Sequence, residues 1–235
     1  MTTNEIMEYL KAHGSEQTKK VLYNHGAREP FYGTKIEDYK KLIKKNKFDN
    51  TTALELYATG NSDAMYMAGL IADGSKMTKE QLQLWVEKAY WKYLSEYTIP
   101  WVATENKYGL ELALEWVKSG KENIASAGWS TLSGIVSVKP DEELDFDLIK
   151  ELFKIIVTDL SKSPNRVRFT MNMFVLSVAC YVMPLHDHAL EVANIIGKVN
   201  VSMGKTACKI PSVIEYVEKV KKAGKLGQKR KTIKC

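Results

Sequence analysis

The stretch DEELDFDLIKELFKIIVTDL, residues 141–160, decides the fold class of this chain. Apolar side chains recur at every fourth position behind an acidic first turn. The apolar positions are Leu144, Leu148, Leu152, Ile156 and Leu160. This period and the acidic start are typical of an amphipathic helix of about five turns. The stretch therefore predicts an α-helix with one buried face.

The segments on either side repeat this helical pattern. Residues 165–182 carry apolar side chains on one face, and Asn165 is the predicted N-cap. Residues 78–94 open with Thr78 and Gln81 in the spacing of a capping box. No segment alternates apolar and polar residues between turn signals, so we predict no β-strand. The chain is therefore expected to be all-α.

The predicted helices come in consecutive pairs. The pairs start at spacings of 27 to 43 residues, near Thr51, Thr78, Gly109, Asp141 and Pro184. Antiparallel pairs at this spacing are typical of an α-solenoid of HEAT-like type, which offers an extended concave surface. An irregular helical bundle is the alternative. We predict the solenoid, with residues 1–222 as a single domain and residues 223–235 as a basic C-terminal tail.

Composition excludes several classes of protein. At 235 residues and 45% hydrophobic content, the chain is long enough for one packed domain. No apolar run approaches the length of a membrane span, and we expect a cytoplasmic protein without a membrane partner. The three cysteines, with His186 and His188, lack zinc-ligand spacing, and no nucleotide-binding motif is present. We therefore expect neither a metal nor a cofactor.

Charge is segregated along the chain. Residues 198–235 hold eleven Lys and Arg against two Glu, a net charge of +9. Residues 1–47 carry +4, whereas residues 48–197 carry −7. Two basic ends around an acidic centre favour a polyanion partner that both ends contact. A basic tail that only keeps the protein soluble is the alternative.

The stretch PFYGTKIEDYKKLIKK, residues 30–45, joins an aromatic glycine turn to a basic helix. Its lysines lie opposite an apolar stripe, as on any solvated helix face. The turn places a helix N-terminus, with free backbone N–H groups, where a phosphate would bind. The predicted phosphate contacts are Arg28, Tyr32, Gly33, Thr34, Lys35, Lys40 and Lys44.

Two later stretches carry further candidates for an anion contact. Arg166 and Arg168 fall in the first turn of a predicted helix, although ion pairs with acidic residues such as Asp159 are equally consistent with the pattern. Lys205 and Lys209 lie before the last predicted helix. Trp129 adds an aromatic candidate, against the alternative that aromatics at helical spacing belong to the core.

The order of these features resembles a known family. YNHGAREPFYGTKIEDYKKLIKK, residues 23–45, is similar to the N-terminal pattern of the AlkD-like HEAT-repeat alkylpurine DNA glycosylases, the DNA alkylation repair family. The likeness in helix order extends over residues 1–222. The resemblance implies a concave surface that binds duplex DNA by its backbone, and hydrolysis of the N-glycosidic bond of cationic alkylpurines.

The resemblance also implies catalytic residues that this chain lacks. The family motif resembles Trp-Trp-Asp-x-x-Asp, and the matching stretch reads SEYTIP, residues 95–100, with Pro100 at the essential aspartate. The family's catalytic arginine falls at Gly128, and its later tryptophan falls near Ala179. Glu96 and Glu105 remain as weak candidates for the carboxylate.

We therefore predict a DNA-binding protein whose base-excision activity is weak, altered or absent. Its expected partner is duplex DNA, including damaged or branched forms, and we expect it beside the nucleoid. The predicted groove is lined or rimmed by Lys40, Lys44, Arg166, Lys205 and Lys209. An active glycosylase with a relocated carboxylate is one alternative. A non-enzymatic helical-repeat scaffold for an acidic protein partner is the other.

Overall fold

The structure, a computed structural model, describes residues 1–234, and their regular structure is helical. No β-strand lies in this range, and a single bridge joins Gly14 to Thr34. In chain order the α-helices are α1 Thr3–His13, α2 Glu16–Asn24, α3 Ile36–Lys45, α4 Asn50–Ala58, α5 Ser62–Ile71, α6 Lys79–Lys88, α7 Ile99–Thr104, α8 Gly109–Trp116, α9 Glu122–Val138, α10 Phe146–Asp159, α11 Asn165–Tyr181, α12 His186–Ile196 and α13 Val213–Lys222.

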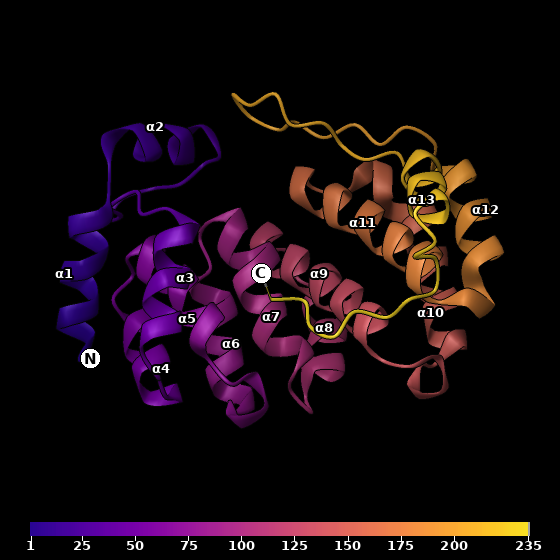
Figure 1. The fold of residues 1–235 in the computed structure, drawn as a ribbon. Coiled ribbons are helices and arrows are strands. Elements are labelled where there is room, and N and C mark those ends of the chain that lie inside the picture. Colours follow the sequence, from indigo (N-terminus) through magenta and orange to yellow (C-terminus); the bar gives the residue numbers. More distant parts are fainter. Residues whose placement is uncertain (235) are drawn as a thin grey trace.

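These helices form an arc of stacked antiparallel pairs (Figure 1). The pairs are α4 with α5, α6 with α7, α8 with α9, α10 with α11, and α12 with α13. Along one row, α7 packs on α9 and α9 packs on α11, so each pair contacts its neighbours. The all-α solenoid of HEAT-like pairs is confirmed. The five pairs begin close to the predicted starts.

The stretch that decided the fold class forms a shorter helix than predicted. The side chain of Asp145 caps the backbone N–H of Leu148, so α10 begins at Phe146. It runs for 14 residues, and residues 141–143 form a separate 3-10 turn. Ile149 and Phe153 join Leu152 in the core, whereas Leu148 is only half-buried. The buried face is therefore rotated from the predicted one.

The N-cap prediction for α11 was wrong by one residue. Pro164 is the N-cap, and Asn165 is the first helical residue. The amide of Asn165 instead exchanges two hydrogen bonds with the backbone of Ser202, at 2.7 and 2.9 Å. For α6, in contrast, the capping box of Thr78 and Gln81 is confirmed.

A π-helical turn interrupts the helix before α7. Residues Leu94–Thr98 form this turn, which leads directly into α7 with Pro100 at its second position. Proline has no backbone N–H and crowds the carbonyl four residues before it. A π-turn absorbs such a defect and is frequent at functional sites. It orients Glu96 toward α11.

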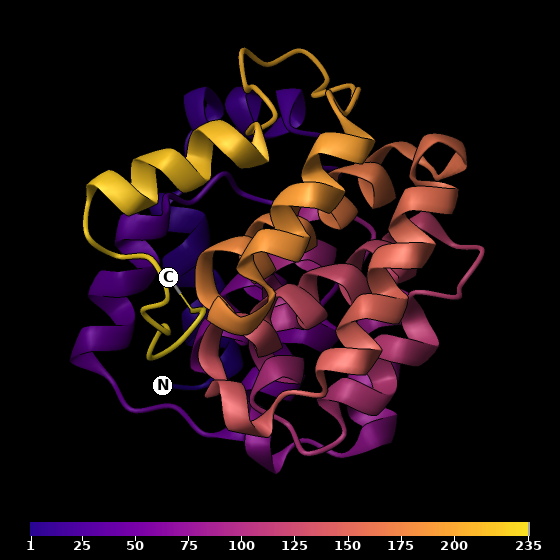
Figure 2. The same ribbon diagram turned by 90° about the vertical axis from the view of Figure 1, so that its right-hand side faces the viewer.

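The C-terminal segment turns back from α13 and runs along the helix ends (Figures 1 and 2). The N–H of Gly227 donates to the carbonyl of Cys180 near the end of α11, at 2.8 Å. The N–H of Arg230 donates to the carbonyl of Ser137 near the end of α9, also at 2.8 Å. The segment predicted as a separate basic tail therefore packs on the helical domain.

Two lysines bond this segment to the C-terminal ends of α9 and α5. Lys229 donates to the carbonyl of Val136 at 2.9 Å and pairs with Asp141 at 2.8 Å. Lys234 donates to the carbonyl of Ala72, after α5, and pairs with Glu105 at 3.1 Å. Cations near helix C-termini are favourable because the last carbonyls lack helical partners. The basic residues thus link the two halves of the arc.

Removal of residues 225–235 is expected to lower the free energy of unfolding by about 2–3 kcal/mol, because it deletes several charge-assisted hydrogen bonds. Urea denaturation of the shortened chain beside the full chain measures this loss. The matched control is Lys231→Ala in the same segment, which is exposed and should change the free energy by less than about 0.5 kcal/mol. Equal stability of the shortened and full chains would contradict the prediction.

No single helix within residues 1–234 is long and apolar enough to cross a membrane. Residues Asn165–Tyr181 and Met183–Ile196 reach that length only as a pair, bent by 115°. No group of three or more metal-ligating side chains occurs in the same range. His186 bonds the carbonyl of Ala179 at 2.7 Å, and His188 stacks on Phe153.

Candidate functional site

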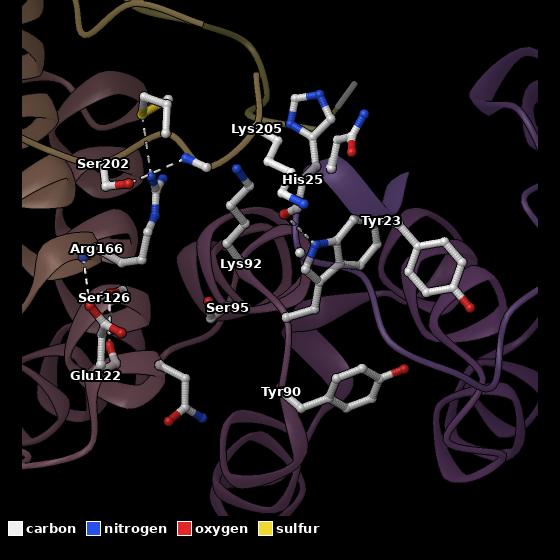
Figure 3. Close-up of a pocket in the computed structure, with 16 residues that line it drawn as sticks. Tyr23, His25, Tyr90, Lys92, Ser95, Glu122, Ser126, Arg166, Ser202 and Lys205 are labelled. Carbon is white, nitrogen blue, oxygen red and sulfur yellow. Dashed lines mark hydrogen bonds between the residues drawn. The ribbon is translucent and has the colours of Figure 1, made fainter. Parts of the chain in front are cut away.

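A cavity of about 590 Å³ opens where α2, α9, α11 and the loop 197–212 meet (Figure 3). Its floor is the junction after α6, where the indole of Trp91 donates to the carbonyl of His25 at 3.0 Å. Its rim includes the first turns of α9 and α11. Pockets of this size are typical of ligand sites. Two segments far apart in sequence, near residues 25 and 200, thus enclose one space.

Three cations line this cavity from different elements. Lys92 comes from the start of the helix that leads into the π-turn, Arg166 from α11 and Lys205 from the loop. Lys92 has no hydrogen bond or ion pair to any residue in 1–234, although it lies 6.0 Å from the ring centre of Tyr93. Lys205 is exposed. Lys92 and Lys205 therefore bring positive charge to the cavity that the described part of the chain does not pair.

Arg166 is the most strongly fixed of these cations. Its Nε and Nη2 donate to the two carboxylate oxygens of Glu96, at 2.6 and 2.5 Å. Its side chain is 15% exposed and that of Glu96 is 4% exposed. The backbone N–H of Arg166 also donates to Glu122 at 2.7 Å. The predicted pairing of an α11 arginine with Asp159 was wrong, because the partner lies 70 residues earlier on the π-turn.

Burial has opposite effects on the two members of this pair. Desolvation raises the pKa of Glu96 above its usual value, and the hydrogen bonds from Arg166 act against that rise. Desolvation also disfavours the charged guanidinium, but the bonds to Glu96 outweigh it and raise the pKa of Arg166. Arg166 is therefore charged, and its Nε and Nη2 atoms both donate to Glu96.

The loop 197–212 is held over the cavity by α11. Arg168 donates to the carbonyls of Asn200 and Ser163, at 2.9 and 3.0 Å. Nη1 of Arg166 lies 3.6 Å from the sulfur of Met203. Arg168 therefore positions the loop rather than lining the cavity.

The predicted phosphate site at the aromatic glycine turn is already filled by the chain itself. Asp63 accepts hydrogen bonds from the backbone N–H groups of Tyr32, Gly33 and Thr34, at 2.5, 2.9 and 3.3 Å. The Thr34 hydroxyl donates to the carbonyl of Leu10, and Thr34 is buried. The prediction of free N–H groups was wrong because a buried carboxylate on α5 occupies them.

The other N-terminal candidates do not line the cavity. Arg28 donates to the carbonyl of Tyr90 at 2.7 Å and covers its ring. Lys40 and Lys44 are exposed on α3, as the amphipathic pattern predicts, and Lys35 is exposed at its N-cap. None of the three lines the cavity. A phosphate contact by these lysines stays a prediction.

Two candidates from the second half of the chain are also placed elsewhere. Trp129 is 1% exposed and packs against Phe174, so the prediction that it contacts DNA was wrong. Lys209 lines a different cavity beside α13. The predicted groove comprised five residues, four lysines and one arginine. Of these, the structure brings only Arg166 and Lys205 together, in the cavity.

The two predicted carboxylates do not reach the cavity. Glu96 forms an ion pair with Arg166. Glu105 pairs with Lys234 and accepts a hydrogen bond from the N–H of Gly74. The carboxylate that does line the cavity is Glu122, in the first turn of α9. Sequence reasoning missed it because an acidic residue at a helix start also has a purely structural explanation.

The family motif fits the cavity better in another register. Residues 90–95 read YWKYLS, an aromatic residue followed by tryptophan, and Trp91, Lys92 and Ser95 all line the cavity. Pro100 does not. In this register Lys92 and Ser95 stand where the motif has its two aspartates. The adjacent aromatic residues Tyr90 and Trp91 were the sequence signal for this register.

The positions assigned to the family arginine and tryptophan face the core. A side chain at Gly128 would meet the backbone of Val117 at 2.7 Å, and Ala179 is fully buried. Neither position reaches the cavity. On α9 the residues that do are Glu122, Asn123 and Ser126, and on α11 it is Arg166.

A second cavity, of about 180 Å³, lies behind the Arg166–Glu96 pair. Glu96, Tyr97 and Phe169 line it, and Arg230 from the C-terminal segment closes one side. Since Arg166 lines the first cavity and Glu96 the second, the ion pair is the wall between them.

Comparisons with known proteins agree with this architecture. The profile of the family described as DNA alkylation repair enzyme matches residues 6–204. Uncharacterised proteins of Listeria innocua and Listeria monocytogenes are each 31% identical over 227 residues, 94% of this chain and 98% of theirs. A solved structure aligns with a TM-score of 0.91 and 34% identity over the whole of both chains. That structure represents a new family of proteins that are related to the HEAT-like repeat DNA glycosylases and have affinity for branched DNA structures. This chain belongs to the DNA alkylation repair enzyme family.

Proposed function

We propose that this protein binds DNA, with a preference for branched DNA, and places a backbone phosphate in the cavity formed by α2, α9, α11 and the loop 197–212. The observation that carries the proposal is the set of cations Lys92, Arg166 and Lys205 around one opening. Phosphate contacts by Lys and Arg dominate nucleic-acid affinity. The affinity of the structural neighbour for branched DNA supports the preference.

Weak or absent base excision is part of the same proposal. Excision of a cationic purine needs a carboxylate to stabilise the developing positive charge on the sugar. Glu96 lies in an ion pair, Glu122 accepts from the backbone N–H of Arg166, and Ser95 and Lys92 occupy the cavity wall beside Trp91. A lysine there would oppose, not stabilise, a developing cation.

The salt dependence of binding tests the phosphate contact. Lys205→Gln should weaken binding to a four-way junction and reduce the slope of log affinity against log salt by about 1, the value for one phosphate contact. Fluorescence anisotropy across a salt series measures both. The matched control is Lys154→Gln on the outer helix α10, which is exposed and should leave the slope unchanged. An unchanged slope for Lys205→Gln would remove this lysine from the interface.

Two comparisons test the remaining parts. Binding of a junction and of a linear duplex of equal length, measured side by side, tests the branched preference, and equal affinities would refute it. Release of methylpurines from alkylated duplex DNA, detected by mass spectrometry beside an active glycosylase, tests the absence of excision. Release above the spontaneous rate, lost in Glu122→Gln, would instead establish a glycosylase that uses the carboxylate in this cavity.

A further inference from the structure

Lys92 is the one lysine that enters the cavity from its floor. The described part of the chain gives it neither a hydrogen bond nor an ion pair, and Figure 3 shows its side chain extending into the cavity between Arg166 and His25. It is half-buried, and its backbone belongs to the helix that continues into the π-turn. A lysine placed this way has an accessible amine on a rigid support.

The surroundings of Lys92 make its amine easier to deprotonate. Desolvation and the guanidinium of Arg166 lower the pKa of Lys92, whereas Glu96 and Cys208 act in the opposite direction. Desolvation and Lys92 in turn lower the pKa of His25, which favours its uncharged imidazole. A lysine desolvated next to another cation is the usual form of an amine nucleophile that attacks a carbonyl carbon.

We propose that Lys92 attacks the aldehyde of an abasic deoxyribose and makes this protein a lyase for abasic sites in DNA. The inference rests on the proposed function, because DNA binding brings the sugar to the cavity. An abasic sugar in its ring-opened form carries a C1′ aldehyde and no base. The cavity of about 590 Å³ accepts such a sugar beside a phosphate held by Arg166 or Lys205.

The reaction balances without an oxidant or a reductant. The Lys92 amine adds to C1′, and loss of one water leaves a protonated imine. A base removes a proton from C2′, and the electron pair forms a C2′–C3′ double bond while the C3′–O bond breaks and the 3′ phosphate departs. Water then hydrolyses the imine, which frees Lys92 and leaves an unsaturated aldehyde. The neutral imidazole of His25, across the cavity, is the group suited to take the C2′ proton.

Borohydride trapping tests the imine directly. The full chain is incubated with a duplex oligonucleotide that contains one abasic site, and sodium borohydride reduces any imine to a stable secondary amine. We expect a covalent protein–DNA adduct, mapped by tryptic mass spectrometry to Lys92. Lys92→Arg keeps the positive charge without the amine nucleophile, so it should lower the adduct at least about tenfold, and the fraction of duplex bound is measured beside it so that the adduct is compared per bound complex. The matched control Lys154→Arg, on the far helix α10, should trap within about twofold of wild type.

A second variant separates the two steps. His25→Asn should retain the trapped adduct but slow strand cleavage at the abasic site, because only the C2′ proton transfer is impaired. An adduct that persists in Lys92→Arg, or no adduct from a protein that binds the same duplex, would overturn the lyase inference and leave DNA binding intact. Absence of both adduct and binding would overturn the proposed function with it.

Discussion

Arg166→Ala is expected to lower the free energy of unfolding by about 3–5 kcal/mol, the usual cost of leaving one member of a buried ion pair without its partner. The side chain of Glu96 is 4% exposed, and both of its oxygens accept from this one guanidinium. Urea denaturation of the two proteins at pH 7 measures the difference. A loss below about 1 kcal/mol would show that water solvates Glu96 in the variant.

The pH dependence of the same variant identifies the cause. Burial raises the pKa of Glu96 above 4.5, so the folded protein binds a proton more readily than the unfolded chain does. A group with a raised carboxyl pKa contributes stability at low pH, which is lost as pH rises through the folded value. Removal of Arg166 raises that pKa further. The deficit of Arg166→Ala should therefore shrink as pH falls from 7 toward 4.5, and a deficit that is constant with pH would contradict this explanation.

A double substitution provides the matched control. Arg166→Met combined with Glu96→Leu removes both charges and keeps apolar volume at the wall between the cavities, so it should recover most of the stability lost in Arg166→Ala. It should still bind DNA more weakly than wild type, because the first cavity has lost a cation. Recovered stability together with weaker DNA binding would show that the ion pair stabilises the fold and that the Arg166 cation contributes to the proposed interface.

Local patterns in the sequence predicted the architecture well. The starts of the helix pairs follow from apolar period and capping residues, such as Thr78 with Gln81, which act within one turn. The predicted length of the helix over 141–160 failed for an equally local reason, because Asp145 competes as the N-cap. Signals confined to one helix thus gave the solenoid, with errors at helix ends.

The candidate site could be predicted only in part, because its contacts span long distances along the chain. Glu96 and Arg166 are 70 residues apart, and Lys234 reaches the carbonyl of Ala72 over 162 residues. No periodicity reports such pairs. Charged residues that look free in the sequence, including Glu105 and Lys229, are therefore engaged in the structure. Lys92 is the reverse case, since nothing in YWKYLS shows that its amine lacks a partner.

Asp63→Ala is expected to lower the free energy of unfolding by about 3–4 kcal/mol, because it leaves several buried donors unsatisfied. The carboxylate accepts from three successive backbone N–H groups of the aromatic glycine turn and from the hydroxyl of Tyr39 at 2.7 Å. Asp63 itself is 3% exposed. Residues 30–34 then keep the hydrogen bond from the N–H of Ser62 to the carbonyl of Pro30 but lose the three bonds that the Asp63 carboxylate accepts.

Two milder substitutions show whether the backbone donors carry this stability. Tyr39→Phe removes a single hydrogen bond and should cost about 1 kcal/mol. Asp63→Asn keeps the size but turns one oxygen into a donor that faces N–H groups, so its cost should fall between the other two. Urea denaturation of the three variants gives the order. Wild-type stability in Asp63→Asn would mean that the negative charge is dispensable, and the turn could then release its N–H groups to a DNA phosphate as the sequence first suggested. The expected order instead means that the Asp63 carboxylate stays bound to the N–H groups of the turn. The proposed anion site is then the cavity beside Lys92 alone.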